Sequence, residues 1–169
     1  MRVRTRQRTA AQTLSALALL GMLLLPAPDA AAAPASASAQ AERATQSLLE
    51  RADFLMASTY REFPAYARQR EAPFDWDTDG CSRPTPQAWA TVFRDACVMH
   101  DFGYHNYGNR GTTRLRLDPT ETRRKAIDDR FLQEMQRICD DRPQTLANCQ
   151  GAARTMHQAV RQYAGSAFY

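Results

Sequence analysis

A central helix is predicted by the segment Phe93-Arg-Asp-Ala-Cys97-Val-Met-His100-Asp-Phe-Gly103-Tyr104, because its apolar residues recur with the period of an α-helix. We expect this helix to extend over residues 90–107, and one of its stripes carries Phe93, Cys97, His100 and Tyr104. A glycine inside a helix costs about 1 kcal/mol relative to alanine. Gly103 therefore indicates packing or the close approach of a neighbouring segment.

A second long helix is predicted to start at Asp118-Pro119-Thr120-Glu121, with Asp118 as the N-cap and Pro119 as the first helical residue. We expect this helix to run to about Cys139. Its inward face would carry four large apolar residues, Ile127, Phe131, Leu132 and Met135.

The rest of the chain also favours helices. A helical pattern starts at Ala41, and a short helix or turn covers residues 60–70. A proline-rich loop over 71–90 and a break over 108–117 separate the central helices from their neighbours. A final helix is expected over residues 145–163, and no strand-like alternation is present. The sequence predicts an all-α domain over residues 41–169.

The N-terminus has the pattern of a secretory signal peptide. Four arginines within the first eight residues precede an uncharged apolar run over 14–25, which small residues follow at 30–33. The run is shorter than the ~20 residues of a membrane-spanning helix. We expect residues 1–32 to be a signal peptide cleaved at about 31–33, a disordered leader over 33–40, and secretion without a transmembrane segment.

Composition narrows the function classes. Hydrophobic residues make up 44% and charged residues 24% of the chain, which excludes a wholly disordered or multi-span membrane protein. The formal net charge of +4 comes mainly from the N-terminal arginines, since 18 basic and 17 acidic residues remain outside residues 1–32. We therefore expect no nucleic-acid partner.

Four cysteines, an even number, fit disulfide bonds in an oxidising compartment. Three pairings are possible, and proximity along the chain favours Cys81 with Cys97 and Cys139 with Cys149. The rival use is a zinc site, because Cys97 and His100 have a ligand-like spacing. No second ligand pair of that kind is present, which favours disulfides.

Two polar residues lie on otherwise apolar helix faces. His100 points the same way as the packing residues of its helix, and Asp128 shares a face with Phe131 and Met135. A buried carboxylate is costly unless it is paired or hydrogen-bonded. If the two helices pack antiparallel, each of these residues offers the other a partner. Asp129 faces away from that stripe, towards solvent.

An acidic stretch precedes the first cysteine. Asp75, Asp77 and Asp79 alternate along the chain and Gly80 follows, as in the first half of an EF-hand calcium loop. The twelfth position is Pro86 in place of glutamate, which argues against a true EF-hand. A solvated acidic turn and a cation site shared with Asp101 remain the two interpretations.

Taken together, these motifs resemble those of the secreted phospholipases A2 of bacteria and fungi. The resemblance covers residues 71–165 and rests on four ordered segments: Asp79-Gly80-Cys81 with 74–79 leading into it, Cys97-Val-Met-His100-Asp101-Phe-Gly-Tyr104, Ile127-Asp128 with Phe131 and Glu134-Met135 after it, and Cys139 with Cys149.

The resemblance implies roles for five residues. His100 would be the general base and Asp128 the residue that orients it. The Asp79 carboxylate, the Gly80 carbonyl and the Asp101 carboxylate would bind Ca²⁺. The family's fold would be a small disulfide-stapled helical bundle with two long antiparallel catalytic helices.

The implied reaction is calcium-dependent hydrolysis of the sn-2 ester of glycerophospholipids, which releases a fatty acid and a lysophospholipid. The implied disulfides are Cys81–Cys97 and Cys139–Cys149. The substrate would be phospholipid at a membrane or micelle surface, and we expect the protein to act as a monomer. The alternative is a catalytically silent phospholipase-like module that binds membranes or a receptor.

Overall fold

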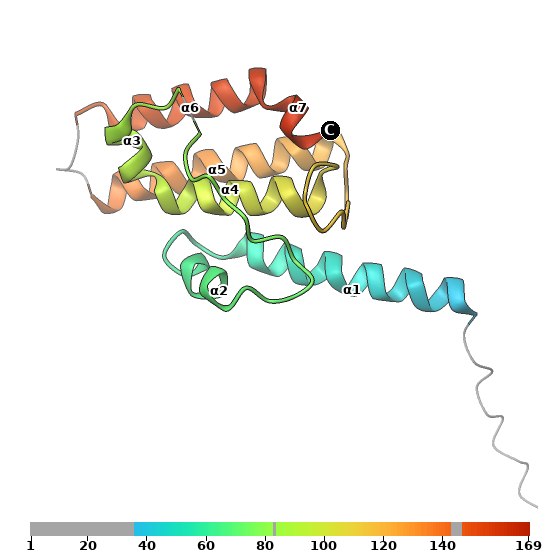
Figure 1. Ribbon diagram of the computed structural model, residues 1–169. Helices are drawn as coiled ribbons and strands as arrows, with labels where there is room; N and C mark the ends of the chain where they lie inside the picture. The colour runs from blue at the N-terminus through green and yellow to red at the C-terminus, as the bar shows by residue number, and fades with distance from the viewer. Residues whose placement is uncertain (1–35, 83, 143–146) are drawn as a thin grey trace, which may run out of the picture. The chain divides into compact units, whose positions relative to one another are not determined.

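The computed structural model describes residues 36–82, 84–142 and 147–169, and within these ranges the chain is helical and contains no strand. The helices are shown in Figure 1, and their bounds are α1 Ala37–Ala57, α2 Phe63–Gln69, α3 Gln87–Val92, α4 Arg94–Tyr107, α5 Glu121–Asp141, α6 Cys149–Tyr163 and α7 Gly165–Phe168. The predicted all-α fold is confirmed. The predicted signal peptide and its cleavage site lie outside the described residues.

Helix α4 lies at the centre, and nine of its 14 residues are buried. One apolar core joins α4 to α1, α2 and the segment around Trp76. A second core joins α3 and α4 to α5 and α6. In Figure 1, α4 and α5 run antiparallel and side by side, and α6 runs back along α5. The predicted antiparallel pair of long helices is therefore present.

The close approach indicated by Gly103 occurs between α4 and α5. A Cβ atom at Gly103 would lie 2.8 Å from Cγ2 of Ile127 on α5. Contacts that short essentially never occur between carbon atoms in proteins, so a side chain at Gly103 would push the two helices apart. Gly103 is three residues after His100, and Ile127 directly precedes Asp128, so this contact lies next to both polar residues in sequence.

Two disulfides fix the ends of the helical core. Cys81–Cys97 ties the loop before α3 to α4, and Cys139–Cys149 ties the end of α5 to the start of α6. Both pairs are those favoured by proximity along the chain. The zinc alternative is wrong, because the sulfur of Cys97 is engaged in a disulfide.

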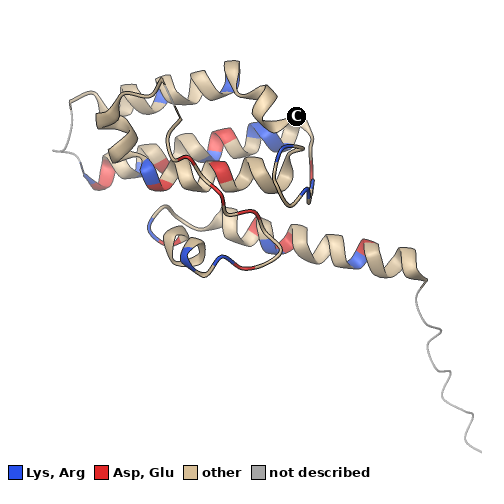
Figure 2. Ribbon diagram, in the orientation of Figure 1, with Lys and Arg blue, Asp and Glu red and all other residues tan. Residues whose placement is uncertain are grey.

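Charged residues of both signs follow one another along α5 (Figure 2). Lys125 pairs with Asp129 one turn later, and Arg130 pairs with the buried Glu134 in the same way. Such pairs stabilise a helix by a few tenths of a kcal/mol when exposed. Glu134 also accepts a hydrogen bond of 2.7 Å from the backbone N–H of Tyr60, so α5 anchors the turn between α1 and α2.

The predicted start of α5 is wrong by two residues. Thr120 is the N-cap, and its hydroxyl accepts a hydrogen bond from the N–H of Arg123. The Asp118 carboxylate is instead engaged by the hydroxyl of Thr120 and the guanidinium of Arg123. Pro119 therefore precedes the cap and does not open the helix.

The helix predicted over 90–107 is two helices, because the chain turns at the fully buried Phe93. Helix α3 begins at Gln87, within the stretch expected to be loop, and ends at Val92, within the stretch expected to be helix. Residues 37–40, expected within a disordered leader, belong to α1, which the side chain of Ser36 caps.

At the other end, α6 begins at Cys149, and the predicted start at residue 145 lies outside the described residues. Among the described helices, none combines the length and the apolar character needed to cross a membrane.

Candidate functional site

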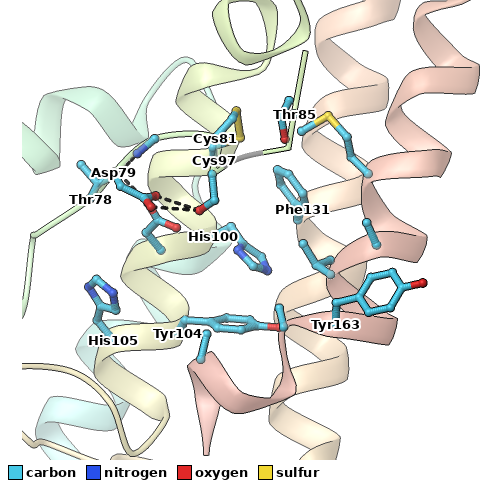
Figure 3. Close-up of a pocket in the computed structure, with 18 of the residues that line it drawn as sticks. Thr78, Asp79, Cys81, Thr85, Cys97, His100, Tyr104, His105, Phe131 and Tyr163 are labelled. Atoms are coloured by element: carbon cyan, nitrogen blue, oxygen red, sulfur yellow. Dashed lines mark hydrogen bonds between the residues drawn. A yellow bond between two sulfur atoms is a disulfide. The ribbon is translucent and has the colours of Figure 1, made fainter. Parts of the chain in front are cut away.

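A cavity of about 750 Å³ lies beside α4, lined by the loop after Trp76, by α5 and by the C-terminal helices. Figure 3 shows His100 and Tyr104 from α4 on one side of it, Phe131 of α5 next to His100, and Tyr163 of α6 on the other side. The α6 wall is largely apolar, and it includes Met156, Val160 and Tyr163. The cavity thus combines titratable side chains on one wall with a surface that suits hydrocarbon on the other.

His100 and Asp128 are in direct contact at this cavity. Nε2 of His100 lies 2.8 Å from Oδ1 of Asp128, and the same oxygen accepts a hydrogen bond of 2.8 Å from the hydroxyl of Tyr104. Since Nε2 is engaged by the carboxylate, Nδ1 is the ring nitrogen that remains for a water molecule. An aspartate placed in this way holds an imidazole in one tautomer and stabilises its charged form.

The Asp128 carboxylate is fully buried but stays ionised. Burial by itself would raise its pKa, but hydrogen bonds from His100, Arg161 and Tyr104 hold the pKa below its usual range. Burial and the neighbouring Asp128 charge raise the pKa of the Tyr104 hydroxyl, so that hydroxyl remains a donor.

The acidic loop meets α4 at the same cavity, which Asp79, Gly80 and Asp101 all line. The hydroxyl of Thr78 donates to Oδ2 of Asp101 at 2.5 Å and accepts a bond of 2.9 Å from the N–H of Gly80. Gly80 has a φ of +73°, a backbone conformation that glycine adopts without strain. The structure therefore brings together the three residues expected to bind a cation.

The other two aspartates of the stretch have structural partners. Asp75 is buried, and its carboxylate accepts hydrogen bonds from the N–H of Asp77 and from both the N–H and the hydroxyl of Thr112. Asp75 thus holds the segment 108–117, where the sequence predicted a break between helices, against the acidic loop. Asp77 forms an ion pair with Arg70.

The sequence profile of the family described as prokaryotic phospholipase A2 matches residues 52–164, a range that includes α4, α5, α6 and the acidic loop. The chain belongs to this family. A secretory phospholipase A2 of Beauveria bassiana (strain ARSEF 2860) is 34% identical over 116 residues. The aligned part covers 68% of this chain and 57% of the fungal protein, so the chain spans little more than half of that relative.

The residues at the acidic loop fit the calcium ion that the phospholipase A2 family implies. The pKa of Asp101 is raised to about 6, mainly by burial and further by the nearby charge of Asp79, against the lowering effect of the Thr78 hydroxyl. A bound cation would relieve this repulsion between carboxylates.

The chemistry of the donors agrees with a hard cation. No group of three or more His, Cys, Asp or Glu side chains in the described part of the chain is placed to hold a metal. Two carboxylates would therefore need carbonyl oxygens and water to complete the six to eight oxygen ligands typical of Ca²⁺. The Gly80 carbonyl is the main-chain ligand that the resemblance implies.

Two residues of this site were not predicted from the sequence. Arg161 donates from Nη1 to Oδ2 of Asp128 at 2.7 Å, and it comes from α6, whose register against α5 is not fixed by helical period. His105 lines the cavity one turn after Asp101, and its Nδ1 lies 3.7 Å from Oδ1 of Asp75. The available signal for His105 was its spacing of four residues from Asp101, which places both side chains on one face of α4.

Proposed function

We propose that this protein hydrolyses the sn-2 ester of glycerophospholipids in a calcium-dependent reaction, releasing a fatty acid and a lysophospholipid. The observation that carries the proposal is the bonded His100–Asp128 pair in the wall of a cavity whose opposite side is apolar. Membership of the prokaryotic phospholipase A2 family and the name of the fungal relative support it.

The dyad supplies the proton chemistry. Neutral His100 takes a proton at Nδ1 from a water molecule as that water attacks the ester carbonyl, and Asp128 stabilises the resulting imidazolium through Nε2. The imidazolium then returns the proton to the sn-2 oxygen of the lysophospholipid as the ester C–O bond breaks and the fatty acid is released. Tyr104 donates to the same Asp128 oxygen and helps to hold it in place. The His100 ring also packs against Phe131, with ring centroids 4.7 Å apart, which limits its rotation.

The apolar wall supports a lipid as the substrate. Met156, Val160 and Tyr163 on α6 offer hydrocarbon contacts for an acyl chain, and Tyr163 is 72% exposed. An aromatic side chain with a polar tip suits the boundary between lipid and water. We infer that the substrate is taken from a membrane or micelle surface.

Calcium would be held by the Asp79 and Asp101 carboxylates and the Gly80 carbonyl. When bound there, Ca²⁺ supplies a positive charge for the lipid phosphate and for the negative charge that develops on the ester oxygen. The two disulfides and the signal-peptide pattern support secretion.

Fatty-acid release from a phospholipid labelled separately at sn-1 and sn-2 tests the proposal. We expect release of the sn-2 label with Ca²⁺ and none with a chelator. Asp101→Ala should raise the calcium concentration that half-saturates the activity. Release that persists with the chelator would overturn the calcium site. No release from folded, oxidised protein under any condition would favour the catalytically silent binding module.

A further inference from the structure

The Asp128 carboxylate is held from three helices. Its Oδ1 accepts hydrogen bonds from His100 and Tyr104 on α4, and its Oδ2 accepts one from Arg161 on α6 at 2.7 Å. Arg124, one turn earlier on α5, places its Nη1 3.5 Å from the same Oδ2. The contact between His100 on α4 and Asp128 on α5 is therefore supplemented by the positively charged guanidinium of Arg161 on α6.

We propose that Arg161 is a positioning residue of the hydrolytic site, acting on His100 through Asp128. The inference rests on the proposed function, in which Asp128 orients the general base. A carboxylate with donors on one oxygen only can rotate about its χ2 torsion, whereas donors on both oxygens fix its plane. By binding Oδ2, Arg161 fixes the direction in which Oδ1 faces His100.

The side chain of Arg161 is itself held in place. Its Nη2 is paired with Glu121, which also accepts hydrogen bonds from Arg124 and from the hydroxyl of Tyr169. Arg124 in turn donates to the backbone carbonyls of Val160 and Arg161, both at 3.4 Å. Arg161 is therefore fixed through both its guanidinium and its backbone.

The charges of this network balance. Asp128 and Glu121 carry two negative charges, and Arg124 and Arg161 carry two positive charges that do not titrate near neutral pH. Asp128 thus keeps a permanent partner while His100 is neutral. A buried carboxylate that depended on a neutral imidazole and a tyrosine alone would be poorly compensated.

The position of Arg161 also links the dyad to the cavity wall. Val160, the preceding residue, and Tyr163, two residues later, both line the cavity. The last turn of α6 thus presents hydrocarbon to the substrate and a guanidinium to Asp128. Two roles can be separated: Arg161 acts on the dyad, or it merely fastens α6 to α5.

Steady-state kinetics on the full chain separate these roles. We expect Arg161→Met to lower kcat by about tenfold or more, the loss typical of removing a partner that orients a site ligand, with KM changed less than about twofold. Arg154→Met is the matched control, because Arg154 is an exposed arginine on the same helix. The control should retain wild-type kcat and KM.

A double-mutant cycle with Asp128→Asn tests whether the effect passes through Asp128. If it does, Arg161→Met adds less than about a twofold loss to Asp128→Asn. An equal loss in both backgrounds, or a rise in KM alone, would assign Arg161 to fastening the helix and overturn the proposal. If Arg161→Met does not fold, Arg161→Gln takes its place in the same cycle.

Imidazole ¹⁵N NMR gives a readout that does not require activity. His100 of the wild type should show a single tautomer, with the proton on Nε2. In Arg161→Met, part of the population should instead carry the proton on Nδ1. An unchanged tautomer in folded Arg161→Met would refute the positioning role. If the wild type released no fatty acid but the tautomer changed as expected, the proposed function would fail and the role of Arg161 would stand.

Discussion

The contact between α4 and α5 at Gly103 offers the most direct mechanical test of how the site is built. Gly103→Ala would place a methyl group 2.8 Å from Cγ2 and 3.2 Å from Cγ1 of Ile127, and 3.2 Å from the terminal methyl of Met56. Met56 ends in a flexible chain and can move aside. Ile127 is β-branched and buried between the helices, so its side chain has few alternative rotamers.

The expected change in unfolding free energy has two opposing parts. Replacing glycine by alanine inside a helix favours folding by about 1 kcal/mol. Overpacking of a well-filled core costs about 1–3 kcal/mol. We therefore expect Gly103→Ala to destabilise the protein by about 1 kcal/mol, within a range of about 0 to 2 kcal/mol set by these two parts.

Urea unfolding of a double-mutant cycle isolates the overpacking. Ile127→Ala removes both contacting carbons, so Gly103→Ala in that background should be neutral or stabilising by up to about 1 kcal/mol. The effect of Gly103→Ala should thus differ by about 1–3 kcal/mol between the two backgrounds. An equal effect in both, or a clear stabilisation of the wild type, would refute the close helix approach that positions His100 beside Asp128.

Three further predictions concern the described charges and disulfides. In chelator, Asp101→Asn should be more stable than the wild type at about pH 7, because the raised pKa of Asp101 in the folded protein makes the wild type lose folding stability as the pH rises from about 4 to 6. Thermal melts should show no difference between the two proteins at about pH 4, and a difference that does not depend on pH would contradict this prediction. Glu134→Ala should destabilise by about 3–5 kcal/mol in urea unfolding, since the charge is fully buried and holds the N–H of Tyr60; a loss below about 1 kcal/mol would be inconsistent with that role. Replacing Cys139 and Cys149 together by serine should cost about 2–3 kcal/mol, the loop entropy of a short crosslink, and an unchanged melting temperature would argue against it.

The pairing of His100 with Asp128 could be predicted from helical period, whereas the roles of Asp79, Gly80 and Asp101 were implied only by the family resemblance. His100 and Asp128 each lie on a stripe of core residues, and burial of two such groups demands a partner. Cys81–Cys97 could be proposed because the two residues are close in sequence. Each of these features depends on a single helix or a short loop, so the spacing of residues along the sequence is enough to predict it.

What the sequence could not provide depends on contacts between helices. Arg161 reaches Asp128 because α6 packs along α5 in one register, and nothing in the α6 pattern specifies that register. The break at Phe93 is local, but apolar residues continue across it, so the period hides the turn. Thr120 replaces Asp118 as the cap because the Asp118 carboxylate is engaged by Arg123.

The structure contains a second His–Asp pair that serves as a control for the first. Nε2 of His157 on α6 lies 3.2 Å from Oδ1 of the exposed Asp129, the residue that follows Asp128 on α5. Neither His157 nor Asp129 lines the cavity. The two pairs share their chemistry and use adjacent aspartates of α5, but they differ in burial and in access to the cavity.

Release of the sn-2 fatty acid by these matched variants therefore shows whether the buried His100–Asp128 pair is the catalytic one. We predict that His100→Ala and Asp128→Asn each lower kcat, His100→Ala by at least about a hundredfold, as expected for loss of a general base. His157→Ala and Asp129→Asn should remain within about twofold of the wild type. Activity that survives His100→Ala, or that falls equally in both pairs, would contradict catalysis by the buried dyad.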